Sequence, residues 1–309
     1  MRTLQKTHLY SEIHEQPGII QILASRTHEE INGLAKQIIM RGIRHVHIAA
    51  RGTSDNAGRY ANYLLGAHNK LVVSLATPSL FTIYNQPPDL SDTLVLGISQ
   101  SGKSPDIVSV VKEGKKQGAL TAAITNVPDS DLGKTADFVL DLAAGQEISL
   151  AATKTYTAQL TLLAALSSAL DQEQTYIQDL HALPQFIEKV FEIEGAVANL
   201  AERYRTMEHC VVIGRGYNYA SAFEFSLKLK ELTYTIAEPY SSADFLHGPV
   251  ALVERGFPVF VIAPDGKMVP EMISLVERVK NQQAEVLMIS NHPELLAMAD
   301  HKIELPRGI

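Results

Sequence analysis

The second half of the sequence repeats the first at a nearly constant spacing, and this repeat restricts the fold more than any other feature. The segment HVHIAARG, which begins at His45, matches HCVVIGRG, which begins at His209, a spacing of 209 − 45 = 164 residues. The segment that begins at Ser104 matches the one that begins at Val269, a spacing of 269 − 104 = 165 residues. Two matching blocks at almost one spacing predict a duplicated structural unit.

The order of elements within each copy indicates what kind of unit is duplicated. Short apolar runs alternate with helix-length segments, which is typical of parallel sheets with crossover helices. We therefore predict an α/β fold of two tandem, doubly wound parallel-sheet lobes of the flavodoxin type. The predicted strands are 45–50, 71–75, 93–99, 119–125 and 138–142 in the first copy, and 210–213, 258–263, 285–289 and 301–304 in the second.

A long helical region separates the copies, from about 151 to 170 and again from about 184 to 204. We assign residues 1–175 to a first lobe with an N-terminal helix, and residues 176–309 to a linker helix and a second lobe. A chain of 309 residues, of which 46% are hydrophobic and 20% charged, can bury a core in each lobe.

Composition argues against several classes of protein. The net charge of −7 is unlike that of a general nucleic-acid binder. The single cysteine, Cys210, allows no intrachain disulfide and favours a reducing compartment. The first 16 residues have no signal-peptide apolar stretch, and the apolar run 160–170 is too short to span a bilayer. We therefore expect a cytoplasmic protein without nucleic-acid or membrane partners. The lack of HExxH and CxxC spacings predicts that there is no metal site, and we expect no other cofactor.

A serine-rich loop, SQSGKSPD (Ser99–Asp106), leads from one predicted strand of the first copy into a helix. Pro105 suits the first helical turn, and Ser104 is the expected N-cap. The free N–H groups and the dipole of such a turn favour phosphate binding, and the matching loop of the second copy, PDGKMVPE, has no hydroxyls. The predicted phosphate donors are Ser99, Gln100, Ser101 and Ser104, together with Thr53 and Ser54 at a second strand–helix junction.

Two other interpretations of these loops stay open at this point. Both junctions could be ordinary helix caps. The letters SGKS also suggest a nucleotide-binding P-loop, but the required glycine five residues before Gly102 is Gly97, which lies inside a predicted strand. The spacing therefore argues against ATP and leaves a small phosphate-bearing anion as the expected ligand.

In the second copy, the segment Tyr219–Ile236 is predicted to form one helix with a polar stripe on its apolar side. At about 100° per residue, Glu224, Lys228, Glu231 and Thr235 lie within about 60° of one another, and Ser226 lies on the back. Partial burial of two acids and a lysine is one way in which catalytic groups acquire useful pKa values. A structural Glu–Lys pair explains the same spacing equally well.

Downstream of this helix, His247 precedes a Gly-Pro turn. Imidazole can move protons near neutral pH, although a lone histidine is more often a surface or capping residue. His247 is therefore a candidate only in combination with the polar stripe.

Taken together, these segments resemble the sugar isomerase (SIS) family and, within it, the isomerase domains of the glucosamine-6-phosphate synthases. The matching residues run in order through most of the chain. They are GTS (52–54), SQSG (99–102), TNVPDSDL (125–132), ATKTYTAQL (152–160), GRG (214–216), LKLKELTY (227–234) and HGP (247–249).

The resemblance implies a role for each candidate. Thr53, Ser54, Ser99, Gln100, Ser101 and Ser104 would hold the sugar phosphate. Glu231 would move a proton between the first two sugar carbons, with Lys228 nearby. His247 would assist ring opening, in that family from the neighbouring subunit of a homodimer with a shared active site.

The sequence departs from the synthase pattern in three places. It has no N-terminal glutaminase domain with its cysteine nucleophile, it stops at Ile309 before the family's further helix and Schiff-base lysine, and Ala152 replaces a serine beside the sugar. We therefore expect either a longer chain or chemistry that proceeds without an imine.

From the residues and the resemblance, we predict an enzyme that converts an amino-sugar 6-phosphate and water into a ketose 6-phosphate and ammonia. The alternatives are another phosphosugar isomerase, a deglycase or a synthase-type activity, with residues near 151–154 choosing the substrate. A different class, a non-catalytic sugar-phosphate sensor, would need the serine loop but not Glu231.

Overall fold

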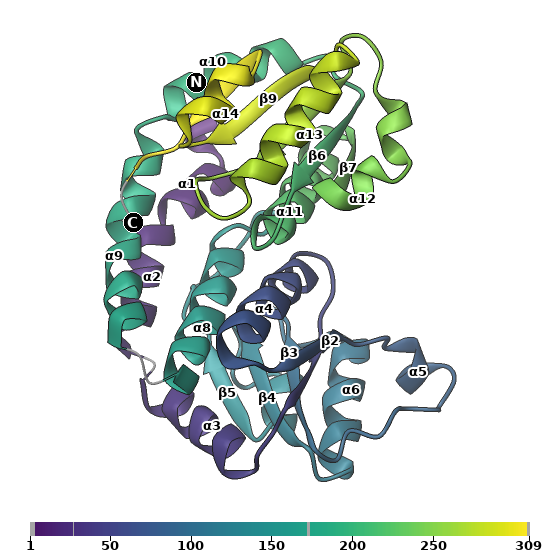
Figure 1. Cartoon of the computed structure of the whole chain (residues 1–309). Coiled ribbons are helices and arrows are strands. Elements are labelled where there is room, and N and C mark those ends of the chain that lie inside the picture. Colours follow the sequence, from purple (N-terminus) through teal and green to yellow (C-terminus); the bar gives the residue numbers. More distant parts are fainter. Residues whose placement is uncertain (1–3, 27, 172–173, 308–309) are drawn as a thin grey trace. The chain divides into compact units, whose positions relative to one another are not determined.

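The computed structural model describes residues 4–26, 28–171 and 174–307. The chain divides into two compact units, Met1–Gln185 and Phe186–Ile309, which we call the first lobe and the second lobe. Each lobe contains a parallel sheet of five strands (Figure 1). The strand order is β2-β1-β3-β4-β5 in the first lobe and β7-β6-β8-β9-β10 in the second. Both are the flavodoxin-type order, so the predicted fold class is confirmed.

The bounds of the first-lobe elements follow the predicted alternation. The strands are β1 (His45–Ala49), β2 (Val72–Leu75), β3 (Thr93–Ile98), β4 (Leu120–Thr125) and β5 (Phe138–Asp141). The helices are α1 (His8–His14), α2 (Gln16–Arg26), α3 (His28–Met40), α4 (Thr53–Asn69), α5 (Ser79–Thr82), α6 (Pro105–Lys116), α7 (Asp131–Thr135) and α8 (Lys154–Asp171), and α9 (Gln174–Phe191) crosses the division between the lobes.

The second lobe repeats this order after α10 (Glu194–Ala201). Its strands are β6 (His209–Gly214), β7 (Ile236–Ser241), β8 (Pro258–Ile262), β9 (Glu285–Ser290) and β10 (His301–Glu304). Its helices are α11 (Asn218–Thr233), α12 (Ser242–Leu246), α13 (Val269–Asn281) and α14 (Pro293–Met298). Short 3₁₀ turns occupy Leu4–Lys6, Glu202–Tyr204 and Pro249–Leu252.

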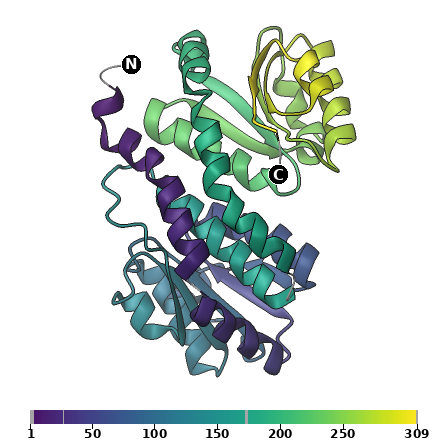
Figure 2. The same cartoon turned by 90° about the vertical axis from the view of Figure 1, so that its left-hand side faces the viewer.

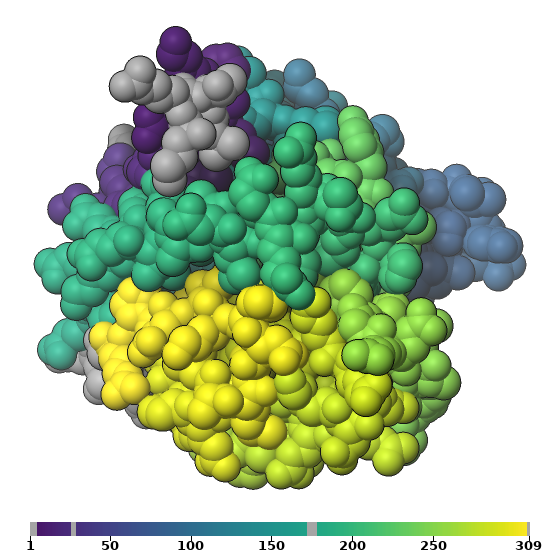
Figure 3. Space-filling view, turned by 90° about the horizontal axis from the view of Figure 1, so that it is seen from above, coloured from purple at the N-terminus to yellow at the C-terminus, as the bar shows by residue number. Residues whose placement is uncertain are grey.

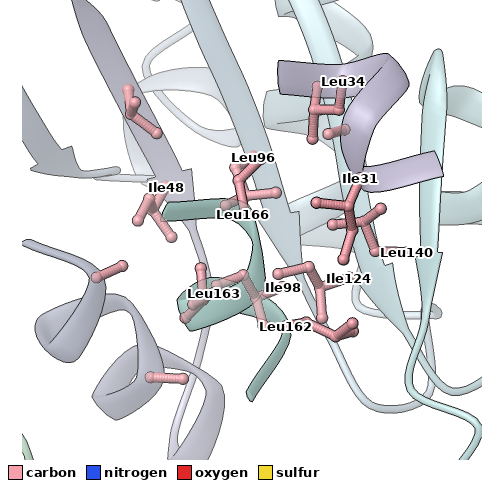
Figure 4. Packing of buried hydrophobic residues seen from close by; sticks show 14 of the residues in the cluster. Ile31, Leu34, Ile48, Leu96, Ile98, Ile124, Leu140, Leu162, Leu163 and Leu166 are labelled. Atoms are coloured by element: carbon pink, nitrogen blue, oxygen red, sulfur yellow. The ribbon is translucent and has the colours of Figure 1, made fainter. Parts of the chain in front are cut away.

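Both faces of the first sheet are buried, which explains why its central strands are apolar runs without alternation. Helices α2, α3, α4 and α8 cover one face, while α6 and α7 cover the other. Helix α2 runs beside α8 (Figure 2). Close packing of α8 against the sheet and α3 is visible in Figure 4, which labels Ile31, Leu34, Ile48, Leu96, Ile98, Ile124, Leu140, Leu162, Leu163 and Leu166.

The second sheet is also covered on both faces, but by fewer helices. Helices α13 and α14 cover one face. Helix α11 lies on the other face, where Phe225 and Leu229 pack with Leu200 of α10. Helix α10 lies beside β10 at the surface (Figure 3). A groove lies between α10, α11 and the strands. It is lined by Leu200, Phe225, Leu229, Phe260, Leu287 and Ile303.

Glycines bring α6 close to β3. A Cβ at Gly97 would lie 2.7 Å from Leu132 and 2.9 Å from Val111, and a Cβ at Gly114 would lie 2.6 Å from Val95. Such contacts are too short for any larger residue, so the helix can sit this near the sheet only because both positions are glycine. This approach fixes where the first turn of α6 begins relative to the end of β3.

Two predicted helices differ from the structure, and one strand was not predicted. The predicted helix Tyr219–Ile236 ends at Thr233, because Tyr234 adopts a left-handed conformation (φ 60°). The strand β7 then follows, which the sequence prediction missed because its segment IAEPYS contains Pro239 and Glu238. Proline is tolerated there since β7 is an edge strand. The linker helix α9 begins at Gln174 rather than near Pro184, which lies inside it.

Candidate functional site

The strand order of the first lobe creates a crevice at the ends of β1 and β3. These neighbouring strands are parallel, with Ala49 paired to Gly97. The helices that follow them leave toward opposite faces of the sheet, α4 to one and α6 to the other. Ligands of doubly wound sheets bind at such a switch point, beyond the carboxyl ends of the strands. The two junctions predicted from sequence therefore lie side by side.

The serine loop, Ser99–Ser104, is shaped by a glycine. Gly102 adopts φ +62°, and a Cβ there would lie 1.9 Å from Ser130 Oγ and 2.9 Å from Thr125 Oγ1. Its N–H donates to Ser99 Oγ at 3.1 Å. Both the backbone conformation and the available space thus require glycine, and Ser99 is committed to holding the loop.

The end of the serine loop begins α6 as predicted, with Pro105 in the first turn and Ser104 as the N-cap residue. The Ser104 hydroxyl, however, makes no capping hydrogen bond. Ser101 is exposed, and among the described residues its Oγ accepts one long hydrogen bond, of 3.4 Å from Lys103 N–H. The first-turn N–H groups of α6 have no acceptor within the helix, so this turn offers N–H and hydroxyl donors to an anion. Gly97 lies within β3, so the P-loop spacing would require strand residues to form the loop.

At the neighbouring junction, Thr53 and Ser54 form the first turn of α4. Ser54 is buried, and its Oγ accepts a hydrogen bond of 3.1 Å from Gln159 Nε2 of α8. Gln159 is fully buried, 105 residues away in sequence. Sequence reasoning did not select Gln159, because no local pattern links it to Ser54.

An ion pair that sequence reasoning also missed joins the two junctions. The Arg51 guanidinium lies 2.6 Å from the Asp106 carboxylate, and the two side chains are 56% and 38% exposed. Solvent screens such a pair, so its contribution to stability is small. Its effect on the site is electrostatic, because it offsets the negative charge that Asp106 places in the first turn of α6.

The second lobe brings the predicted polar stripe of α11 together. Lys228 Nζ lies 3.2 Å from Glu224 Oε1 and 2.7 Å from Glu231 Oε2. The Glu224, Lys228 and Glu231 side chains are 9%, 19% and 30% exposed, so accessibility increases toward Glu231. A carboxylate that a lysine holds in place while one side stays accessible is a suitable general base.

Two members of the predicted helix pattern have surroundings that the sequence did not indicate. Thr235 is outside the helix, and its hydroxyl donates to Met207 O at 3.2 Å. Ser226, predicted to lie on the back of the helix, is fully buried and donates to the Ala237 carbonyl of β7. The back of α11 faces β7, the strand that the sequence prediction missed, which explains why Ser226 is buried. Thr235 lies outside the helix because α11 ends at Thr233.

His247 is the C-cap residue of α12 and is exposed. Within residues 4–26, 28–171 and 174–307, no hydrogen bond or ion pair joins it to Lys228 or Glu231. The short helix itself is fixed at its start, where Ser241 Oγ accepts from Asp244 N–H and Ser242 Oγ donates to Glu271.

Other chemistry finds little support in the described part of the chain. Burial raises the pKa of the Cys210 thiol to about 12, so it is not an activated nucleophile. No group of three or more His, Cys, Asp or Glu side chains among the described residues is arranged to hold a metal ion. None of the helices in these same ranges combines the length and apolar character needed to cross a membrane.

The chain is similar to a family model, to curated proteins and to solved structures. The model of the SIS domain matches residues 39–169 and 204–308. Glutamine–fructose-6-phosphate aminotransferase (isomerizing) from Thermus thermophilus is 32% identical over 313 residues, which cover 97% of this chain and 52% of that protein. The chain thus spans about half the length of the curated relatives it matches.

Solved structures extend the same result. The C-terminal domain of glucosamine-fructose-6-phosphate aminotransferase from Francisella tularensis has a TM-score of 0.88 at 28% identity, over 98% of this chain and 90% of that one. Glucosamine-6-phosphate deaminase from Thermotoga maritima has a TM-score of 0.74 at 20% identity, over 97% and 88%. At that identity the deaminase shows a shared fold only.

Proposed function

The chain belongs to the SIS domain family, and on that basis we propose that it is an enzyme that binds an amino-sugar 6-phosphate and catalyses aldose–ketose isomerisation with release of the amine. The observation that carries the proposal is the set of hydroxyl and N–H donors at the switch point of the first sheet. Ser104 and Ser101 border the first turn of α6, and the first turn of α4 lies at the next strand end. A dianionic phosphate fits donors of this kind.

In this proposal the phosphate-binding residues belong to the first lobe and the acid–base residues to the second. Thr53, Ser54, Ser99, Gln100, Ser101 and Ser104 form the phosphate-binding set. Ser99 and Ser54 contribute through loop geometry as well, because each already has a partner in the chain. Glu231 is the base, Lys228 holds its carboxylate, and His247 serves ring opening.

The chemistry balances with these groups alone. Ring opening moves a proton from the anomeric hydroxyl to the ring oxygen. Glu231 then takes the proton from C2 of the open aldose and returns it to C1, while O1 gains the proton that the C2 amine loses, so that the 2-amino aldehyde becomes a 2-imino alcohol. Water adds to the imine carbon and expels ammonia, leaving the ketose 6-phosphate. General acid–base catalysis of this kind requires one carboxylate within reach of both carbons.

An assay that measures both products tests the proposal. Incubation with glucosamine 6-phosphate and its epimers should give ammonia and ketose 6-phosphate in equal amounts. Ketose formed from an aldose 6-phosphate without any ammonia would restrict the activity to isomerisation. A protein that binds inorganic phosphate but converts no hexosamine or hexose 6-phosphate would contradict the enzyme proposal and favour a sensor.

A second candidate is synthesis in the opposite direction, which fits the match of 97% of this chain to 52% of an isomerizing aminotransferase. Supplying ammonium ions and fructose 6-phosphate should then yield glucosamine 6-phosphate. Because one catalyst accelerates both directions of this reaction, the concentrations of ammonium and sugar phosphate set the direction of net flow. A chain that forms no glucosamine 6-phosphate even with ammonium in excess contradicts the second candidate.

A further inference from the structure

The connection between β5 and α8, residues 142–153, is held by the N-terminal helix α1. The Glu12 carboxylate accepts hydrogen bonds from Ile148 N–H at 2.5 Å and from Ser149 N–H at 3.3 Å. Glu12 is only 3% exposed. Burial by itself raises the pKa of the Glu12 carboxyl, but the hydrogen bonds from Ser149 and Ile148 and the Lys154 charge outweigh it and keep the pKa below its usual range.

Two further charged groups fix the same connection. Lys154, whose side chain is 3% exposed, lies 2.6 Å from Glu15 Oε2 and donates to Gln146 O at 2.8 Å. Glu147 accepts from Thr153 N–H at 2.9 Å and from Thr155 Oγ1 at 2.5 Å, which closes the connection onto the start of α8. Burying charged groups costs free energy. A loop held by such groups is therefore more tightly fixed than a simple connection between a strand and a helix requires.

Both ends of the connection are attached to the phosphate-binding set. At its start, the Asn126 side chain bonds to Ala144 N–H and Gly145 O, while Asn126 N–H donates to Gln100 O at 3.1 Å. Beyond its end, Gln159 donates to Ser54 Oγ. The connection therefore lies at the same edge of the first sheet as the serine loop.

The end of the connection and the helix that follows it, α8, each retain a polar atom without a partner among the described residues. Thr153 Oγ1 and Gln159 Oε1 are buried and have no hydrogen-bond partner among the described residues. Buried polar atoms without partners are uncommon in folded proteins. Gln159 is the residue that donates to Ser54 Oγ, and Thr153 is the last residue of the connection, so a ligand that reaches either side chain finds an unused hydrogen-bonding atom there.

Building on the proposed function, we propose that Glu12 is a positioning residue that fixes the β5–α8 connection for contact with the sugar part of the substrate. The phosphate is held by the serine loop and the first turn of α4, whereas the hydrogen bonds of Glu12 go to Ile148 and Ser149 of the connection. The connection meets the hydroxyl-bearing carbons, and α1 keeps it in the receptive conformation. Glu12 thus acts on recognition of the sugar and not on capture of the phosphate.

Two ligands separate this role from a general structural one. Calorimetric titration of Glu12→Gln should show inorganic phosphate binding within twofold of the unaltered protein and fructose 6-phosphate binding weakened at least tenfold. Glu29→Gln, an exposed carboxyl on α3, is the matched control and should change neither. Equal weakening of both ligands, or unchanged fructose 6-phosphate binding, would overturn the inference.

Hydrogen exchange on the unaltered protein covers the case in which the variant does not fold. Fructose 6-phosphate should slow exchange of the amides of residues 146–153 at least fivefold more than inorganic phosphate does. Equal protection by both ligands contradicts the role of the connection. If neither ligand binds the unaltered protein, the proposed function fails and this inference fails with it.

Discussion

The two lobes share one strand order, yet the ends of their strands carry different chemistry. In the first lobe, hydroxyl groups gather where α4 and α6 begin. In the second lobe, the matching positions are Tyr217 and Asn218 at the start of α11 and a loop without hydroxyls before α13. Its ionisable groups lie further along α11, where Lys228 and Glu231 occupy the positions of Leu64 and Ala67 of α4 at the 164-residue spacing.

One feature of the switch point is common to both lobes. Arg51 pairs with Asp106 at 2.6 Å, and their counterparts Arg215 and Glu271 pair at 3.3 Å. In each lobe the pair joins the connection after the first strand to the helix after the third strand. It is present in the first lobe, where the loop before α6 carries hydroxyls, and in the second, where the loop before α13 has none. We infer that features present in both lobes maintain the fold of the switch point, whereas features present in one lobe serve the ligand.

The largest effect is expected for the carboxylate that only the second lobe carries. Glu231→Gln removes the base but keeps the shape of the side chain, so turnover should fall by about 10²–10⁴. Binding of fructose 6-phosphate should stay within threefold. Steady-state assays and titration calorimetry measure the two quantities.

The control for this experiment is Glu277→Gln, an exposed acid on α13. It should leave turnover unchanged. If Glu231→Gln keeps more than a tenth of the activity, Glu231 is not the base, and the proposed assignment of the acid–base group to α11 is wrong.

A smaller effect should distinguish the glycines at matching positions of the two loops. Gly102 and Gly266 both have positive φ, +62° and +146°, but only Gly102 is enclosed, whereas no atom lies within 4 Å of a Cβ at Gly266. Gly102→Ala adds a clash with Ser130 to the backbone strain and should destabilise the first lobe by about 3 kcal/mol. Gly266→Ala should cost about 1–2 kcal/mol through strain alone.

Denaturant unfolding with a probe in each lobe measures both changes. Phosphate affinity should fall only in Gly102→Ala. Similar losses of stability in the two variants would mean that the serine loop adapts around a side chain, and that its shape is less specific than the close contacts indicate.

Elements with a strong local pattern could be predicted from the sequence. The central strands are unbroken apolar runs, and the serine loop is recognisable from Ser104 and Pro105 alone. The edge strand β7 could not be predicted in this way, because an edge tolerates Pro239 and polar residues that would be excluded from the sheet interior.

Local sequence patterns could not predict contacts between side chains that are distant in sequence. The contact between Glu12 and Ile148 spans 136 residues, and the one between Gln159 and Ser54 spans 105. Periodicity indicates which face of an element is buried but not which buried polar groups meet. The position of Asp106 in the first turn of α6 was visible, whereas its pairing with Arg51 depends on the adjacency of β1 and β3.

The smallest effect concerns two serines that both precede helices. Ser241 caps α12, since its Oγ accepts from Asp244 N–H at 3.2 Å and donates to Asp244 Oδ2 at 2.7 Å. Ser104 is the N-cap residue of α6 but makes no capping hydrogen bond. Ser241→Ala should therefore lower the unfolding free energy by about 1 kcal/mol, whereas Ser104→Ala should change it by less than about 0.5 kcal/mol.

Phosphate binding should reverse this order. Loss of one hydrogen bond to a charged group weakens binding by about tenfold or more, so Ser104→Ala should lose that much affinity for inorganic phosphate while Ser241→Ala loses none. A serine that stabilises its helix cannot at the same time give its full hydrogen-bonding capacity to a ligand. If Ser104→Ala instead destabilises the first lobe and leaves phosphate binding intact, Ser104 is an ordinary cap, and the serine loop no longer differs in kind from its counterpart.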